Sequence, residues 1–187
     1  IIVAPGFGQR GLDGKILAVE YARVNKIPFL GICLGMQMAV IEYARNVKKI
    51  RYANSTEISE KCKDPVIDLM TSQKEIINKG GTMRLGAWDC EIHKNTISNK
   101  IYSKKVVSER HRHRYEFNDE YSKKIFDENF IVAGKNPETN LVEIVENKDH
   151  PWFVGVQFHP EYKSSVYNPH PIFVNFVKAS LKNYLKK

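Results

Sequence analysis

The sequence predicts an α/β fold with an open, mostly parallel central sheet, helices on both of its faces and a small additional antiparallel β region. Strand, helix, strand and helix patterns follow one another within the first fifty residues, which favours parallel strands joined by covering helices. Short β-rich segments recur in the second half, before a final helix. The stretch between residues 49 and 86 is polar and is interpreted as loops around one short strand.

The first half of the chain supplies the alternating elements. Ile1 to Val3 is apolar and β-branched, and Pro5-Gly6-Phe7-Gly8 ends it, as expected for a buried strand that enters a glycine-rich loop. A helix is predicted over residues 14–25, although its apolar pattern is only moderately amphipathic. Residues 29–32 are wholly apolar and predict a second buried strand. From Leu34 to Val47 apolar residues recur every three or four positions, which predicts a helix with one buried face.

The second half predicts mostly β structure. In order, the predicted segments are a short strand at residues 66–70, hairpins within 85–102, an extended segment at 106–117, β-rich stretches at 141–145 and 153–158, and a helix at 171–185.

The length of 187 residues favours one globular domain over the whole chain, residues 1–187. No apolar run approaches the roughly 20 residues that span a bilayer, so no membrane association is expected. The chain opens on an apolar strand and not on a charged leader, and we expect an excised domain whose N-terminal neighbour is missing.

The cysteines and the net charge narrow the functional classes. Cys33, Cys62 and Cys90 have neither Cys-x-x-Cys nor zinc-ligand spacing, which favours a reducing compartment, the cytoplasm. The net charge of +8 raises the alternative of a non-catalytic module that binds nucleic acid through Arg110 to Arg114. Most lysines are scattered, however, so a solvated surface is the favoured interpretation and no nucleic-acid partner is expected.

The segment Gly31-Ile32-Cys33-Leu34-Gly35 places a cysteine between two glycines at a strand-to-helix junction, the cysteine form of a nucleophile elbow. Side chains at the glycine positions would collide with the following helix or the neighbouring strand. The helix N-terminus would favour the Cys33 thiolate over the thiol. An isolated cysteine would be interpreted as a small buried apolar residue, but the glycine spacing favours a nucleophile.

A thiolate nucleophile needs a base and an orienting partner for that base. His159-Pro160-Glu161 offers both, because His159 follows an apolar strand and Glu161 can fix its tautomer. The histidines at 93, 150 and 170 lie in polar or proline-bounded loops and are weaker candidates. The oxyanion of a tetrahedral intermediate would be bound by the N–H of Leu34 and by that of Gly6, where no side chain blocks the backbone.

With the Cys33 segment and Gln157-Phe158-His159-Pro160-Glu161 both present, the chain resembles the class I, or triad, glutamine amidotransferases. Three further stretches are similar to the C-terminal glutaminase domain of CTP synthases, and the resemblance covers essentially the whole chain. They are Asn54-Ser55-Thr56-Glu57, Gly80-Gly81-Thr82-Met83-Arg84-Leu85-Gly86 and Glu109-Arg110-His111-Arg112-His113-Arg114-Tyr115-Glu116.

The resemblance implies that Cys33, His159 and Glu161 form a catalytic triad and that Gly6 and Leu34 form the oxyanion hole. L-glutamine would be bound by Gly6, Leu34, Gln37, Glu57 and Arg114. A carboxylate suits the α-ammonium group of glutamine and a guanidinium suits its α-carboxylate, which agrees with Glu57 and Arg114.

The resemblance also implies the setting of the reaction. Ammonia from glutamine would pass to a synthetase domain that lies outside this chain and aminates UTP with ATP and Mg2+. No cofactor is expected in the glutaminase domain itself. GTP is the implied allosteric activator, and the intact enzyme is implied to be a homotetramer. A glutaminase that serves another synthetase, for example one making GMP or carbamoyl phosphate, remains the alternative within the family.

Two details accompany this interpretation. Family members usually read Pro-Gly-Gly-Phe-Gly at the oxyanion loop, whereas this chain has Pro5 in place of the first glycine, which fixes φ and removes one N–H. In an extended segment His111 and His113 would share one face, but no third ligand accompanies them, so a structural role is favoured over a metal site.

Overall fold

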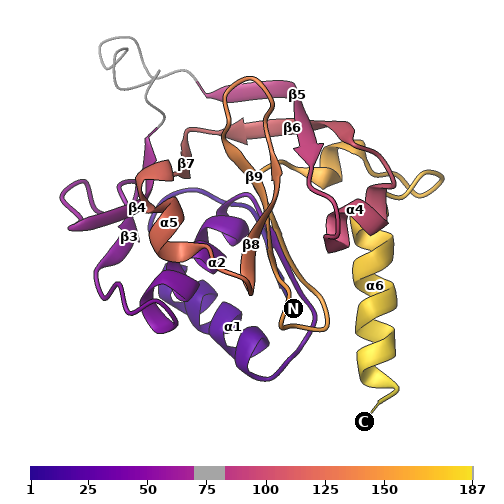
Figure 1. The fold of residues 1–187 in the computed structure, drawn as a ribbon, viewed down its shortest axis with the longest axis horizontal. Coiled ribbons are helices and arrows are strands. Elements are labelled where there is room, and N and C mark those ends of the chain that lie inside the picture. Colours follow the sequence, from indigo (N-terminus) through magenta and orange to yellow (C-terminus); the bar gives the residue numbers. More distant parts are fainter. Residues whose placement is uncertain (70–82, 187) are drawn as a thin grey trace.

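The structure, a computed structural model, describes residues 1–69 and 83–186 (Figure 1). The large sheet has the strand order β1, β2, β10, β9, β8, β5, β6. Their bounds are β1 Ile2–Val3, β2 Phe29–Ile32, β10 Phe153–Val156, β9 Val142–Asn147, β8 Phe130–Lys135, β5 Arg84–Ile92 and β6 Val106–His113. A second, three-stranded sheet consists of β3 Ala53–Ser55, β4 Asp64–Leu69 and β7 Tyr115–Phe117.

Helices cover both faces of the large sheet, as predicted. They are α1 Leu12–Val24, α2 Leu34–Asn46, α4 Ile97–Tyr102, α5 Ser122–Ile125 and α6 Pro171–Tyr184, with 3-10 turns η1 Asp119–Tyr121 and η2 Pro160–Lys163. One core joins α1 and α2 to Phe29 and Phe153, whose rings stack across paired strands at 4.3 Å. The other joins Ile172 and Phe176 of α6 to Leu30 and Val154, which point to the opposite face.

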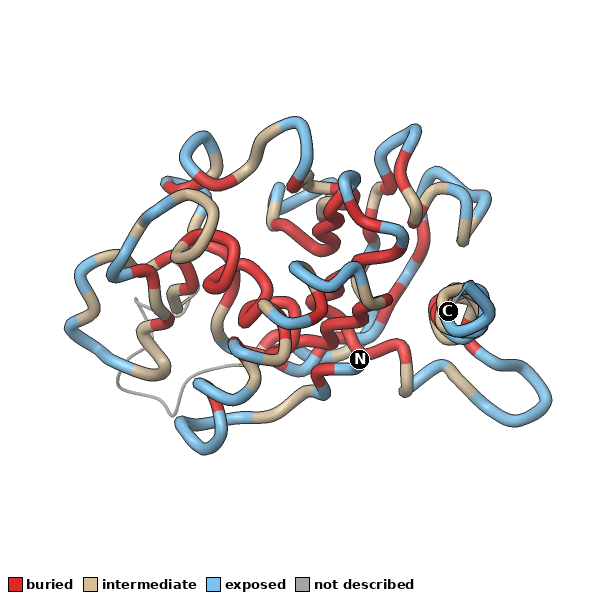
Figure 2. The backbone as a smooth tube through the Cα atoms, turned by 90° about the horizontal axis from the view of Figure 1, so that it is seen from below, coloured by how far each residue is buried: buried red, intermediate tan, exposed pale blue. Residues whose placement is uncertain are grey.

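Burial is deepest around α2 (Figure 2). Every residue from Leu34 to Ala44 is buried, because this helix lies between the large sheet, α1 and the small sheet. By contrast, α6 keeps an exposed outer side, where Val177 and Leu181 face solvent. The helix that follows Cys33 is therefore the most fully buried of the described helices.

The α/β class is confirmed, but the large sheet is mixed where a mostly parallel one was expected. Among the described strands of the large sheet, only β1, β2 and β10 pair in parallel, and β9, β8, β5 and β6 extend the sheet in antiparallel pairs. Short connections join β8 to β9 and β9 to β10, and such connections can join only antiparallel neighbours. The additional β region is likewise mixed, since β3 pairs with β4 in parallel and β4 with β7 in antiparallel.

Several predicted segments differ in detail. The predicted hairpins over 85–102 were wrong, because β5 pairs along its length with β6 and residues 97–102 form a helix capped by Thr96. The extended segment 106–117 is confirmed as β6 and β7, with a break at Arg114. The strand predicted at 66–70 lies within β4, and Met70 and the Gly80-Gly81-Thr82 stretch fall outside the described residues. Strand β8 was not predicted.

In the described part of the chain, no helix is both long and apolar enough to cross a bilayer.

Candidate active site

Cys33 occupies the sharp junction between β2 and α2. Its backbone has φ 51° and ψ −103°, a conformation that non-glycine residues rarely adopt and that costs roughly 1–3 kcal/mol. The flanking glycines make the junction possible, as predicted. A Cβ atom at Gly31 would lie 2.6 Å from the Gly35 carbonyl, and one at Gly35 would lie 2.1 Å from the Val3 carbonyl oxygen. The Cys33 N–H donates to the Val156 carbonyl at 2.7 Å, which fixes the junction to β10.

His159 and Glu161 emerge at the same edge of the sheet as Cys33. Strands β2 and β10 are parallel neighbours with Ile32 opposite Val156, so both chains leave the sheet at their carboxyl ends side by side. His159 Nδ1 lies 2.6 Å from Glu161 Oε1, and the imidazole is 3% exposed. Within the described residues, His159 Nε2 has no hydrogen-bond partner, which leaves it available for proton transfer.

The side chain of Gln157 contacts both Cys33 and Gln37. Its Nε2 donates to Cys33 Sγ at 3.6 Å, and its Oε1 accepts from Gln37 Nε2 at 3.2 Å. The negative charge of Glu161 also acts to raise the pKa of the Cys33 thiol. Gln157 belongs to the motif around His159, but the sequence alone predicted no role for it. Its signal was its position two residues before His159, just after the end of β10.

Burial dominates the protonation of the candidate nucleophile. It raises the pKa of Cys33 to about 12, although the backbone N–H of Leu34 and the amide of Gln157 act in the opposite direction. The N–H of Leu34 at the helix N-terminus does lower the pKa of Cys33, as expected, but desolvation raises this pKa by more. A thiol in this state needs a base to accept its proton.

A cavity of about 390 Å³ opens over Cys33. It is lined by six of the residues predicted to bind substrate or form the nucleophile, namely Gly6, Cys33, Leu34, Gln37, Glu57 and Arg114. It also contains five that were not predicted there, namely Phe7, Met83, Arg112, His113 and Tyr115. These six residues come from separate parts of the chain, and the fold brings them together, whereas His159 and Glu161 are not among the residues that line the cavity.

The cavity wall is held by specific contacts. Glu57 Oε1 accepts the N–H of Gly8 at 3.0 Å, which ties the predicted oxyanion loop to the small sheet's neighbouring turn. Gln37 Nε2 donates to the Tyr115 carbonyl at 2.8 Å. A Cβ atom at Gly6 would lie 3.3 Å from Leu34 Cδ2, so the two predicted oxyanion residues are close neighbours.

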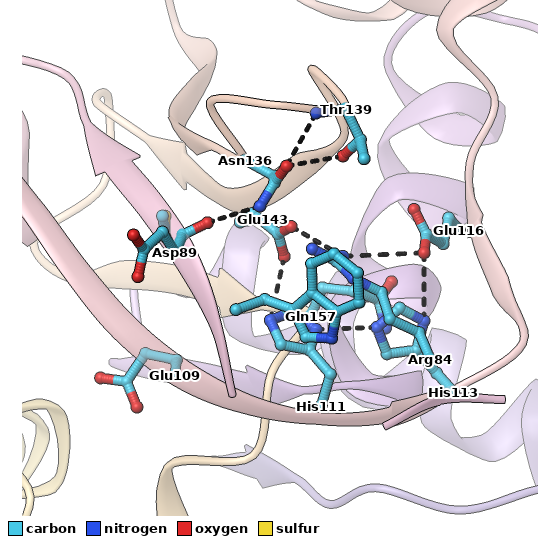
Figure 3. A network of polar contacts seen from close by, with 12 residues as sticks. Arg84, Asp89, Glu109, His111, His113, Glu116, Asn136, Thr139, Glu143 and Gln157 are labelled. Atoms are coloured by element: carbon cyan, nitrogen blue, oxygen red, sulfur yellow. Dashed lines mark hydrogen bonds and ion pairs between the residues drawn. The ribbon is translucent and has the colours of Figure 1, made fainter. Parts of the chain in front are cut away.

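Behind the cavity lies a buried ionic cluster formed by Arg84, His111, His113, Glu116 and Glu143 (Figure 3). Arg84 Nη1 lies 2.7 Å from Glu143 Oε1 and 3.7 Å from Glu116 Oε1, and His111 Nδ1 lies 2.8 Å from His113 Nε2. Burial raises the pKa of Glu116 to about 8 and lowers the pKa of both histidines. The two histidines share one buried face of β6 and are part of the packing, as their alternation predicted.

Among the described residues, no three His, Cys, Asp or Glu side chains are arranged to hold a metal ion.

Comparison with known proteins gives the class of protein that has this fold. Residues 1–179 match the family described as "Glutamine amidotransferase class-I", and the chain belongs to it. More particularly, it is 60% identical over all 187 residues to a CTP synthase of Christiangramia forsetii and 59% identical over 186 residues to one of Flavobacterium johnsoniae. The chain covers 34% and 35% of those proteins, so it spans about a third of the length of these relatives.

Solved structures agree. A structure titled "Trypanosoma brucei CTPS - glutaminase domain with bound acivicin" superposes with a TM-score of 0.91 and 42% identity, covering 97% of this chain and 70% of that one. A glutamine amidotransferase of Thermotoga maritima matches with a TM-score of 0.55 at 17% identity over 86% of this chain and 55% of that one, which shows a shared fold alone.

Proposed function

We propose that this chain hydrolyses L-glutamine to glutamate and ammonia through a γ-glutamyl thioester on Cys33. The observation that carries the proposal is that Cys33, which lines the cavity, and the His159-Glu161 pair leave adjacent parallel strands at one edge of the sheet. Membership of the class I family supports the same chemistry.

Glutamine would lie in the cavity with its carboxamide over Cys33. Glu57 would bind the α-ammonium group and Arg114 the α-carboxylate, and Gln37 would contact the substrate from the first turn of α2. The cavity lining contains Glu57 and Arg114, whose charges match the α-ammonium and α-carboxylate groups of glutamine. It also contains Cys33, whose sulfur would meet the uncharged carboxamide.

The reaction then needs one proton carrier. His159 Nε2 accepts the proton of Cys33 as sulfur attacks the carboxamide carbon, and the N–H groups of Gly6 and Leu34 stabilise the oxyanion. The same imidazole returns the proton to the departing nitrogen, so ammonia leaves and a thioester remains. His159 next removes a proton from water, which attacks the thioester and releases glutamate. Glu161 keeps the imidazole in the required tautomer and stabilises its cationic form.

The high pKa of the Cys33 thiol makes this coupling necessary. Burial raises the pKa of the Cys33 thiol to about 12, so the sulfur needs His159 to accept its proton when it attacks the substrate. Pro5 does not interfere with the Gly6 donor, but it removes its own N–H and restricts the loop before it. The remaining loop is tied to Glu57 through Gly8, which holds Gly6 beside Leu34.

The similarity to CTP synthases supports a wider role for the complete protein. Ammonia would pass to a synthetase domain outside this chain that aminates UTP with ATP and Mg2+, with GTP as activator and a homotetramer as the assembly. The chain would then lie C-terminal to that domain and form one glutaminase domain over residues 1–187. Three free cysteines fit the cytoplasm. The identity of 55–62% to eight CTP synthases favours this role over a glutaminase serving another synthetase.

Measurement of ammonia release from glutamine tests the proposal. Cys33→Ala is expected to abolish release while the circular dichroism spectrum is unchanged, and Cys62→Ala, at a partly exposed position outside the cavity lining, is expected to behave as the unchanged chain. Equal ammonia release from the Cys33→Ala variant would remove Cys33 from the mechanism. Salt-dependent binding to DNA or RNA, together with no reaction with a glutamine-mimicking diazoketone, would favour the basic-module alternative.

A further inference from the structure

The short turn η2 carries Glu161 and lies along strand β6. Two contacts to β6 flank Glu161 in sequence. The N–H of His159 donates to the Arg110 carbonyl at 2.8 Å, and the ammonium group of Lys163 donates to the Ser108 carbonyl. The position of the Glu161 carboxylate relative to the imidazole therefore depends on how firmly this turn is held at both ends.

Lys163 also faces a buried carboxylate. Its Nζ lies 3.7 Å from Oε2 of Glu109, whose side chain is only 2% exposed. The other carboxylate oxygen of Glu109 accepts from the hydroxyl of Tyr102 and from His170 Nε2, each at 2.9 Å. These partners belong to α4 and to the residue that caps α6, so Glu109 is fixed by elements other than η2.

The contact between Lys163 and Glu109 pairs a partly exposed ammonium group with a buried carboxylate. Within the described residues, Glu109 Oε2 has no hydrogen-bond partner, and a buried carboxylate is stabilised only when its charge is matched. Lys163 supplies that charge from the surface end of η2. In Figure 3 no dashed line joins Glu109 to Arg84, His111, His113, Glu116 or Glu143.

We propose that Lys163, held by buried Glu109 and the Ser108 carbonyl, is a positioning residue that fixes Glu161 and, through it, the His159 imidazole for reaction with Cys33. The inference rests on the proposed function. The contacts of the Lys163 ammonium group are to Ser108 and Glu109, so Lys163 acts through the turn.

This role predicts a particular kinetic pattern. Strand β6 also leads to Arg112 and Arg114, which line the cavity. General damage to β6 would therefore weaken substrate binding as well as turnover. Loss of the Lys163 contact alone would leave β6 paired with β5 and would slow only the steps that need a correctly placed imidazole.

The test is the reaction of Cys33 with a glutamine-mimicking diazoketone, measured by mass spectrometry as a maximal labelling rate and a half-saturating concentration. Lys163→Met is expected to lower the maximal rate roughly tenfold to a hundredfold and to leave the half-saturating concentration within about twofold. Lys163→Arg, which keeps the charge, is expected to restore most of the rate. Lys105→Met is the matched control, because Lys105 adjoins β6 and its exposed ammonium group pairs with half-buried Glu91 at 3.2 Å.

A second variant changes Glu109, the partner of Lys163 in this contact. Glu109→Gln keeps one acceptor oxygen but removes the charge, and it is expected to lower the maximal rate with little added effect in the Lys163→Met background. Three results would overturn the inference and leave the proposed function standing. The first is an unchanged maximal rate in Lys163→Met and in Glu109→Gln, and the second is an equal fall in the maximal rate of the Lys105→Met control. The third is a half-saturating concentration that rises as the rate falls. Absence of labelling in the unchanged chain would overturn both.

Discussion

Replacing Gly35 with alanine tests the packing that holds the candidate nucleophile. An added Cβ atom would lie 2.1 Å from the Val3 carbonyl oxygen and 3.0 Å from the Val3 carbonyl carbon, whereas ordinary contact begins at 3.4 Å. Both neighbouring atoms are backbone, so no side chain can rotate away. Strand β1 and the first turn of α2 must separate by about an ångström or more, and we expect a loss of about 3 kcal/mol in the free energy of unfolding.

Urea unfolding followed by circular dichroism measures this loss, with Gly14→Ala as the matched control. Gly14 lies in α1, where an added Cβ atom would meet nothing within 4 Å, so the same change should raise stability by about 0.5–1 kcal/mol. The reasoning would be refuted if Gly35→Ala were as stable as Gly14→Ala. Because the first turn of α2 also carries the Leu34 N–H, the Gly35→Ala variant should react more slowly with a diazoketone even where it remains folded.

Three further predictions concern the triad and the charges around it. Glu161→Gln should lower kcat for glutamine hydrolysis by about 10²-fold or more, because the His159 imidazolium loses its stabilising charge; an unchanged kcat would exclude the carboxylate from the mechanism. Arg84→Met should cost about 3–5 kcal/mol in urea unfolding because it leaves buried carboxylates unpaired, whereas Lys26→Met, in an exposed ion pair, should cost under about 1 kcal/mol; equal losses would contradict the argument. Burial acts to raise the pKa of Asp127, but hydrogen bonds from a lysine, two backbone N–H groups and a tyrosine lower this pKa to about 2. The Asp127 carboxylate therefore stabilises the fold above its ordinary pKa of 3.8, and this stabilisation is lost as the pH falls towards 2. Stability of Asp127→Asn should therefore fall less steeply between pH 4 and 2, and parallel curves for the two chains would be the contrary result.

The parts of the fold that the sequence predicted are those fixed by local rules. An apolar run, two glycines around Cys33 and a helical repeat identify β2, the junction and α2 without knowledge of their neighbours. The alternation in Arg110 to Arg114 likewise predicted that His111 and His113 share one face of the strand, and that face of β6 is buried. In each case the signal lies within one turn of helix or a few residues of strand.

The parts that were not predicted depend on distant partners. Arg84 and Glu143 have the composition of surface residues, and they are buried only because β5, β6 and β9 bring them within 2.7 Å of each other. Helix α4 is six residues long, so its apolar pattern is too short to separate from a strand, and its cap at Thr96 was the available signal. The mixed sheet direction follows from the short connections between β8, β9 and β10, which periodicity does not reveal.

The candidate site shows the same division. The nucleophile and the His159-Glu161 pair were identified from short motifs, and the structure places both at one edge of the sheet. Arg112, His113 and Tyr115 could be seen to neighbour Arg114 in sequence, but their part in the cavity depends on the approach of β6 to α2 and the Gly6 loop.

The central claim is that the sulfur of residue 33 and the imidazole of residue 159 meet in one site. A crystal structure of this chain after reaction with a glutamine-mimicking diazoketone measures this most directly. We predict an adduct on Cys33 whose sulfur lies about 3–4 Å from Nε2 of His159, with the amino acid head between Glu57 and Arg114. An adduct on another residue, or a sulfur separated from the imidazole by intervening protein, would contradict the account.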